Sequence, residues 1–199
     1  VAYAWAYAQA LEAIAATTVP PRAAWLRALL LERERIANHL GDLGYLGNDV
    51  ALSFGFMQFW RLKEDWLRLT AKYFGHRYLF DCIVPGGVAE DISDSGKTEF
   101  AVAADRIEAE VRELKAIYDD QSTLQDRFSN TGICKPDLAA RLGLTGLPGR
   151  ASAQAWDARV QFPQSPYDQL NVNMATNRRG DVLARAEVRF AEVAESLRL

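Results

Sequence analysis

The sequence has only two cysteines, Cys82 and Cys134, and they lie far apart in its 199 residues. Neither belongs to a Cys-x-x-Cys pair, and neither has histidines at the spacing of a zinc site. This pattern excludes a metal site built on local cysteine motifs. We expect two reduced, buried thiols, while a disulfide between them stays open because sequence does not fix their separation in space.

Long hydrophobic runs and an excess of positive charge are also missing. No apolar stretch approaches the roughly 20 residues that a membrane helix requires. The net charge of -3 gives no basic surface for nucleic acid, so we expect no nucleic-acid partner. The chain does not begin with methionine, and its first residues lack the pattern of a signal peptide. We therefore expect a trimmed piece of a longer polypeptide.

What is present is a series of helical patterns. Residues 2–16 are rich in alanine and aromatic side chains, which predicts a buried helix. Two consecutive prolines, Pro20 and Pro21, end it and begin a long helix that runs to about Gly44. A third, aromatic-rich helix is predicted over residues 54–74. The face of the second helix that we expect to be buried carries Trp25, Leu29, Glu32, Ile36, Leu40 and Leu43.

The second half of the chain is less regular. Residues 78–84 predict a short strand before a Pro-Gly-Gly turn, and an apolar stripe over residues 100–118 predicts another helix. Glycine and proline interrupt residues 122–173, where only 136–142 look helical. Asp181 is the expected cap of a last helix. The prediction is a mainly α fold: a helical bundle forming one domain over residues 1–199, with one irregular or β-containing excursion.

Two ionisable residues stand on the apolar side of the second helix. Glu32 and His39 lie seven residues apart, hence on one face, and Arg35 follows Glu32 by one turn. Because an unpaired buried charge is costly, these groups must be paired. The simpler interpretation is a structural ion pair with a hydrogen-bonded core histidine, and the alternative is a functional polar cluster. The spacing is not His-Glu-x-x-His, so no zinc hydrolase is indicated.

Spacing says little about the other polar residues. Ser95-Gly96-Lys97-Thr98 resembles the end of a phosphate-binding loop, but Asp91 stands where that loop needs glycine, so we dismiss it. Arginines on the last helix are expected to be solvated or bridged to acidic neighbours. We expect these remaining charges to face water: Asp49, Lys63, Glu64, Arg150, Asp157 and Arg159.

Several stretches resemble one family, in that family's order. Residues 19–23 (Val-Pro-Pro-Arg-Ala) and 31–40 (Leu-Glu-Arg-Glu-Arg-Ile-Ala-Asn-His-Leu) resemble the large subunits of group 4 membrane-bound nickel–iron (NiFe) hydrogenases. They also resemble the equivalent 49 kDa subunit of complex I, the NADH-quinone oxidoreductase. Residues 55–64 are similar to the formate-hydrogenlyase type, whereas residues 85–91 are similar to the quinone-reducing relatives. The resemblance covers nearly the whole chain.

The resemblance implies partners and cofactors. It implies a helical core packed against an iron–sulfur small subunit, near a complex I-like 30 kDa-type domain and membrane proton-translocating subunits. The complex would be cytoplasmic and peripheral, on the inner face of the cell membrane. Hydrogenase members hold a NiFe centre through two Cys-x-x-Cys pairs, and this chain has neither. We therefore expect no cofactor in this chain, a NiFe centre in the longer parent, and an iron–sulfur cluster in the partner subunit.

The resemblance also assigns candidate site residues. Glu32, Arg35 and His39 match family positions beside the active-site cavity, where we expect a network that holds or relays protons. Asp49 matches an acidic position near the quinone cavity of complex I relatives. The family's Arg-Ala-Ser-Gly ends in Ala153 here, which predicts a different turn because alanine lacks glycine's freedom to adopt positive φ.

The predicted function is the core of the large, catalytic subunit of a membrane-associated hydrogenase complex. That complex would oxidise hydrogen or reduce protons, with electrons passing through the iron–sulfur subunit. This chain alone is expected to be inactive. Two alternatives remain: a quinone-binding subunit of a complex I-like NADH-quinone oxidoreductase, and a non-catalytic scaffold derived from the family.

Overall fold

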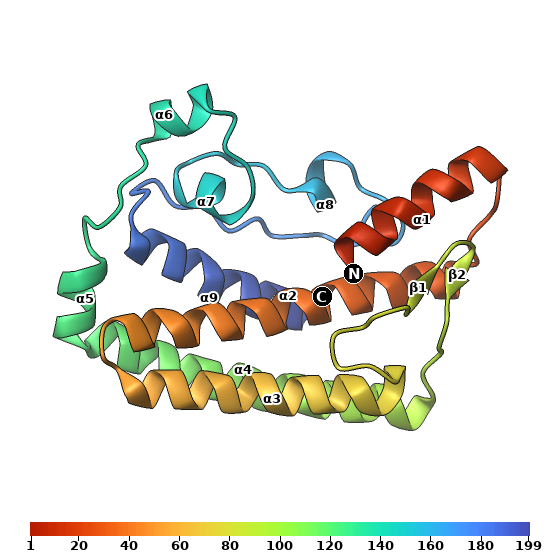
Figure 1. The fold of residues 1–199 in the computed structure, drawn as a ribbon, viewed down its shortest axis with the longest axis horizontal. Coiled ribbons are helices and arrows are strands. Elements are labelled where there is room, and N and C mark those ends of the chain that lie inside the picture. Colours follow the sequence, from red (N-terminus) through yellow and green to blue (C-terminus); the bar gives the residue numbers. More distant parts are fainter.

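The computed structural model describes residues 1–199, and the prediction of a mainly α fold is confirmed (Figure 1). Helices α2 (Pro21–Asp49) and α3 (Ser53–Phe74) form a long hairpin. Helices α4 (Asp94–Asp120) and α9 (Val182–Arg198) run beside them and complete a bundle. The four helices share one apolar core, whose buried members include Leu40, Phe59, Ile107 and Val193.

The helix ends follow from local chemistry. Pro21 begins α2, where its missing N–H is not needed. Asp181 caps α9 as predicted, accepting a hydrogen bond of 2.8 Å from the Ala184 N–H. Helix α2 continues beyond the predicted end at Gly44 as far as Asp49. Its glycines there lie directly against side chains of α3 and α4, so they serve close packing instead of ending the helix.

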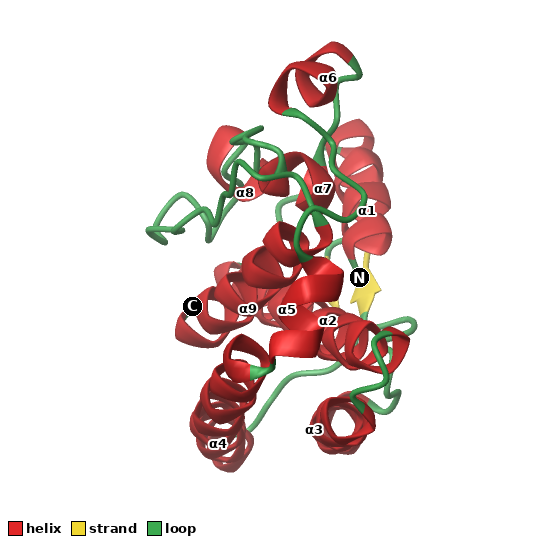
Figure 2. Cartoon of the chain, turned by 90° about the vertical axis from the view of Figure 1, so that its left-hand side faces the viewer, coloured by secondary structure: helices red, strands yellow, loops and turns green.

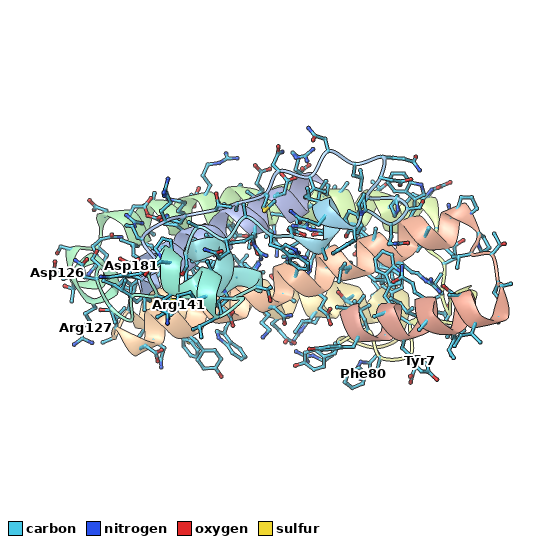
Figure 3. All side chains as sticks on the ribbon, turned by 90° about the horizontal axis from the view of Figure 1, so that it is seen from above. Tyr7, Phe80, Asp126, Arg127, Arg141 and Asp181 are labelled. Atoms are coloured by element: carbon cyan, nitrogen blue, oxygen red, sulfur yellow. The ribbon has the colours of Figure 1, made fainter.

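Helix α1 (Ala2–Ala15) lies across the first half of α2, outside the bundle. The prediction of a buried helix is wrong, because only the side carrying Trp5, Ala8 and Glu12 is covered. Tyr7 points away from the protein (Figure 3). Trp25 of α2, also predicted to face inward, is 45% exposed. Both errors arise because an apolar pattern does not say how much of a helix its neighbours cover.

The predicted strand over residues 78–84 is mostly wrong. Only its last two residues form β1 (Ile83–Val84), which pairs antiparallel with β2 (Gly87–Val88). Residues before β1 form turns, with positive φ at Leu79 and Asp81. Both cysteines are free thiols, of which Cys82 is buried as predicted and Cys134 is partly exposed.

The irregular excursion, residues 122–173, contains more helix than predicted. It includes α5 (Ser122–Phe128), α6 (Pro136–Arg141), α7 (Gly146–Ala151) and α8 (Ala158–Gln161), of which only α6 was expected. Seen from one end, α6, α7 and α8 lie on one side of α9 and α2, with α3 and α4 on the other (Figure 2). No helix is both long and apolar enough to cross a bilayer.

Candidate functional site

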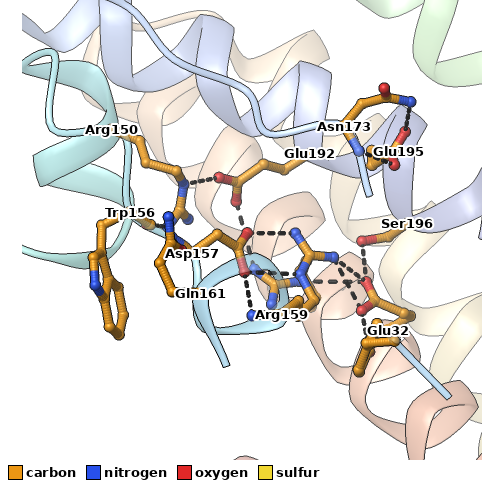
Figure 4. A network of polar contacts seen from close by, with 12 residues as sticks. Glu32, Arg150, Trp156, Asp157, Arg159, Gln161, Asn173, Glu192, Glu195 and Ser196 are labelled. Atoms are coloured by element: carbon orange, nitrogen blue, oxygen red, sulfur yellow. Dashed lines mark hydrogen bonds and ion pairs between the residues drawn. The ribbon is translucent and has the colours of Figure 1, made fainter. Parts of the chain in front are cut away.

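Glu32 lies at the centre of a buried polar network formed by α2, α9 and the excursion (Figure 4). Arg159 donates to both carboxylate oxygens, at 3.0 and 3.1 Å, and Ser196 Oγ donates at 2.5 Å. The Tyr167 hydroxyl donates to the same carboxylate. Arg35 Nε lies 3.4 Å from Oε2. The Glu32 carboxylate is therefore fully paired despite its burial.

Glu192 of α9 forms a second centre in the network. It accepts hydrogen bonds from Arg150 Nε at 2.5 Å and from His39 Nε2 at 2.7 Å. Burial by itself raises the pKa of Glu192, but the bonds from His39 and Arg150 outweigh it and hold that pKa at about 2. Arg35 Nη1 lies 3.7 Å from Glu192, so the Arg35 guanidinium links the two carboxylates.

Asp157 and Arg159 anchor the excursion to this network. Asp157 caps α8, accepting from the Arg159 N–H at 3.0 Å, and also accepts from Arg159 Nη2 at 2.7 Å. Burial raises the pKa of Asp157, yet the hydrogen bonds and charge of Arg159 lower it to about 2. The expectation that Arg150, Asp157 and Arg159 face water is wrong, since all three are buried.

The network is electrically balanced. Burying an unpaired ion costs several kcal/mol, so each charge needs a partner within the protein. Each buried carboxylate here contacts at least one guanidinium. These ion pairs hold the excursion in one position against the bundle. The network's charged members are the carboxylates Glu32, Asp157 and Glu192 and the guanidiniums Arg35, Arg150 and Arg159.

His39 is the network member whose ordinary pKa lies closest to neutral pH. Its burial lowers the pKa of the imidazole, while the hydrogen bond to Glu192 acts in the opposite direction. A neutral His39 donates from Nε2 to Glu192, which leaves Nδ1 as an acceptor. That Nδ1 is buried and has no hydrogen-bond partner. The arrangement provides one unoccupied proton-accepting atom beside a paired carboxylate.

The network reaches an open groove of about 480 Å³ through Glu32, Tyr167 and Ser196. The walls of the groove are mostly apolar and come from α2, from Ile92 and the first turn of α4, from residues before α9, and from the end of α9. Among the lining residues are Trp25, Leu26, Leu29, Ile92 and Leu170. Apolar walls with a few convergent polar groups are typical of ligand sites.

The predicted site residues separate into two places. Glu32, Arg35 and His39 come together as expected. Asp49 is exposed at the end of α2, ten residues beyond His39, or about 15 Å along a helix. It makes no side-chain hydrogen bond or ion pair. Sequence reasoning missed Tyr167, Glu192 and Ser196. A signal existed for Glu192, because it follows the apolar Val188 by four residues and so shares its side of the last helix.

The residues of this chain do not fit a NiFe centre. No three His, Cys, Asp or Glu side chains are grouped so that they could hold a metal ion. Cys82 is buried beside backbone carbonyls, and burial raises the pKa of its thiol, which disfavours a thiolate ligand. The chemistry that these residues offer is acid–base and electrostatic.

Comparison with known proteins identifies relatives over nearly the whole chain. Residues 16–199 match the family described as "Respiratory-chain NADH dehydrogenase, 49 Kd subunit". Over 97% of the chain, 32% of residues are identical to the carbon monoxide-induced hydrogenase of Rhodospirillum rubrum, of which 54% is covered. Over 98% of the chain, 32% of residues are identical to NADH-quinone oxidoreductase subunit 4 of Thermus thermophilus, of which 47% is covered.

A solved structure agrees with these relatives. A chain of the membrane-bound sulfane sulfur reductase, an archaeal respiratory membrane complex, superposes with a TM-score of 0.88 and 25% sequence identity. The match covers 94% of this chain and 50% of that one. The present chain thus spans about half the length of the relatives it matches.

Proposed function

The chain belongs to the family of the respiratory-chain NADH dehydrogenase 49 kDa subunit, and we propose that it forms the core of the large subunit of a membrane-associated hydrogenase complex. The complex would oxidise hydrogen or reduce protons, with electrons passing through an iron–sulfur subunit. The relative named as a carbon monoxide-induced hydrogenase supports this proposal. Members of the family are oxidoreductase subunits, and we propose that this chain alone is inactive.

The observation that carries the proposal is the buried His39–Glu192 pair. Hydrogen chemistry requires protons to be delivered and removed at a site that excludes water. His39 supplies a buried acceptor at Nδ1, and Arg35 connects Glu192 to Glu32 at the edge of the open groove. The pair therefore holds a proton position close to a route from solvent.

The geometry sets how firmly a proton is held. A proton taken up at Nδ1 makes His39 an imidazolium, which the Glu192 carboxylate stabilises at 2.7 Å. Burial and the nearby charges of Arg35 and Arg189 oppose that imidazolium and lower the pKa of His39. Because burial is the larger effect and the pKa is lowered, the proton is held weakly and can leave again. Weak binding of the proton suits a relay better than a proton store.

The proposal includes partners and location. The relatives carry names of respiratory complexes, which supports an iron–sulfur small subunit, a 30 kDa-type domain and membrane proton-translocating subunits as partners. We place the complex on the cytoplasmic, inner face of the cell membrane. Since the residues of this chain do not fit a NiFe centre, that centre would be held by other segments of the parent polypeptide.

A quinone-binding subunit is the second candidate, and the open groove favours it. Apolar walls with the Tyr167 hydroxyl, Glu32 and Ser196 at one side suit an amphiphilic ring with hydrogen-bonding oxygens. The Thermus thermophilus relative supports this candidate as strongly as the hydrogenase supports the first. Asp49 does not line the groove, so it would serve a quinone only in a cavity completed by other polypeptide.

The test is to purify the complex that contains this chain and to measure hydrogen-dependent viologen reduction, nickel content and quinol formation. Hydrogen activity with nickel is the expected result, and His39→Gln should lower it about tenfold or more without loss of nickel. His76→Gln is the matched control, because the chain has only these two histidines. Quinol formation without hydrogen activity would replace the first candidate by the second, and a complex with neither activity would indicate a scaffold.

A further inference from the structure

Arg33 of α2 is a buried cation without a carboxylate partner. Its side chain is 2% exposed. Nε and Nη2 donate to Thr70 Oγ1, and Nη2 also donates to the Trp66 carbonyl at 3.0 Å. Nη1 is buried and has no hydrogen-bond partner. Each of the other buried guanidiniums pairs with a carboxylate. They belong to Arg27, Arg150 and Arg159.

Two aromatic rings hold this guanidinium in place. Its central carbon lies 3.8 Å from the ring centroid of Trp66 and 4.2 Å from that of Phe100. Cation–π contacts of this kind offset part of the cost of burial, but they provide no countercharge. Burial lowers the pKa of Arg33 to about 9, so the guanidinium keeps its charge at neutral pH.

Arg33 forms part of the wall of a cavity of about 250 Å³ between α2, α4 and the end of α9. Lys97 also lines this cavity and is the second cation there, with its ammonium already paired to Asp94. Glu32 lines it too, but its carboxylate is engaged by Arg159 and Ser196. Ser196 is the other polar group in the wall, and its hydroxyl already donates to Glu32. The rest of the wall is apolar: Leu29, Ile36, Trp66, Ile92, Phe100, Ala101, Ala104, Leu197 and Leu199.

We propose that this cavity binds a small amphiphilic monocarboxylate, such as a medium-chain fatty acid, with its carboxylate paired to Arg33. A guanidinium is the residue best suited to pair with a carboxylate, and the apolar wall suits an alkyl chain. At about 30 Å³ per heavy atom, the cavity has room for roughly eight such atoms. Octanoate has about two more heavy atoms than this, so the end of its chain extends into the neighbouring 480 Å³ groove, which shares Leu29 and Ile92 with the cavity.

Other ligand chemistries fit less well. Inorganic phosphate or sulfate would leave the apolar wall uncovered. A cation would meet two positive charges, and a neutral alcohol would leave the Arg33 charge uncompensated. The proposal does not depend on hydrogen or quinone chemistry, because Arg33 takes no part in the His39–Glu192 pair.

The experiment is calorimetric titration of the protein with octanoate, with octan-1-ol and octylamine as neutral and cationic probes of the same length. We expect saturable octanoate binding that is about tenfold or more tighter than that of either control, as a charge-assisted bond to a buried group implies. Two results with the unaltered protein would overturn the proposal. One is that octanoate does not bind, and the other is that octan-1-ol binds as tightly as octanoate.

Variants then locate the site. Arg33→Met keeps an unbranched, apolar side chain and should weaken octanoate binding about tenfold, whereas Arg33→Lys should keep part of it. The control is Arg22→Met, which removes a half-exposed cation from the larger groove alone and should leave the affinity unchanged. Equal weakening by Arg33→Met and Arg22→Met would show a diffuse charge effect and reject the assigned pairing.

Discussion

His39 Nε2 lies 2.7 Å from a carboxylate oxygen of Glu192, a contact between residues 153 positions apart in the sequence. The other oxygen of the same carboxylate accepts from Arg150 Nε at 2.5 Å. One buried side chain therefore joins α2, α9 and α7. Arg35 approaches Glu192 as well, but it is also paired with Glu32, so removing the negative charge of Glu192 would leave Arg150 as the guanidinium without a carboxylate.

The first prediction concerns that charge. Glu192→Gln should lower the free energy of unfolding by about 3 kcal/mol, because it leaves the buried Arg150 without a countercharge. Urea unfolding followed by circular dichroism measures the change. The control is Glu187→Gln on the same helix, whose carboxylate pairs with the half-exposed Arg179 and should cost under about 1 kcal/mol. Equal losses in the two variants would mean that the buried network adds nothing to stability.

Acid sensitivity should follow from the same group. The pKa of Glu192 is about 2 in the folded protein against an ordinary 4.5, so its contribution is fully present above pH 4.5 and is lost as the pH falls toward 2. The difference corresponds to about 3 kcal/mol. Urea unfolding at a series of pH values should show a smaller loss between pH 5 and 2 in Glu192→Gln than in the unaltered protein. If the free energy of unfolding fell equally in the two proteins over this pH range, Glu192 would not be the group responsible.

His39 should cause a separate loss of stability that begins at a higher pH than the loss from Glu192. The folded pKa of His39 is lowered from an ordinary 6.5, so as the pH falls below about 6.5 the unfolded chain takes up a proton that the folded protein does not. His39→Gln should remove this loss. Proton NMR can follow both imidazoles, with His76→Gln assigning the two signals. A His39 signal that titrates above pH 6.5 would reverse the expected sign.

The long helices could be predicted because their contacts leave a local periodic pattern. The pairing of Glu32 with Arg35 followed from the same logic, since a buried charge on an apolar stripe needs a neighbour. The partners of Glu32 from the excursion could not be found this way. Arg159 and Tyr167 lie 127 and 135 residues away in a segment rich in proline and glycine, where no period marks a buried side chain.

Ala153 shows a further limit of local reasoning. The sequence predicted a changed turn because alanine avoids positive φ, yet Ala153 adopts a φ of 66°. Its N–H donates to the Asn177 carbonyl at 2.7 Å, and Asn177 N–H donates to the Arg150 carbonyl at 2.8 Å. These backbone bonds to the segment before α9 hold the left-handed conformation against its intrinsic cost.

Ala153→Gly should therefore stabilise the protein. Glycine adopts the left-handed conformation without the cost that alanine has, which stabilises the folded protein by about 1–2 kcal/mol. Its greater freedom in the unfolded chain lowers the stability by about 0.5–1 kcal/mol. We expect a net gain of up to about 1.5 kcal/mol in the free energy of unfolding. Ala151→Gly is the control, because Ala151 is buried in α7 with helical φ and should lose stability. A loss in both variants would show that Ala153 is not strained.

The last prediction tests the close approach of α2 and α3 to Tyr118 of α4. The Tyr118 hydroxyl donates to the Leu43 carbonyl at 2.9 Å, and a Cβ on Gly47 would overlap that hydroxyl oxygen. A Cβ on Gly55 would instead meet both the hydroxyl and the ring, at 2.6 Å from Oη and 2.7 Å from Cε2. Either alanine substitution should cost about 1–3 kcal/mol by overpacking.

Removing the hydroxyl distinguishes the two glycines. Tyr118→Phe should recover most of the loss in Gly47→Ala, because the next atoms, Tyr118 Cζ and the Leu52 carbonyl, lie at 3.3 and 3.4 Å from the added Cβ. It should recover little in Gly55→Ala, where the ring carbon remains in the way. Double-mutant cycles from urea unfolding measure both coupling energies. Similar recovery at the two positions would mean that the ring shifts freely, and that the helices around Tyr118 pack less tightly than their glycines imply.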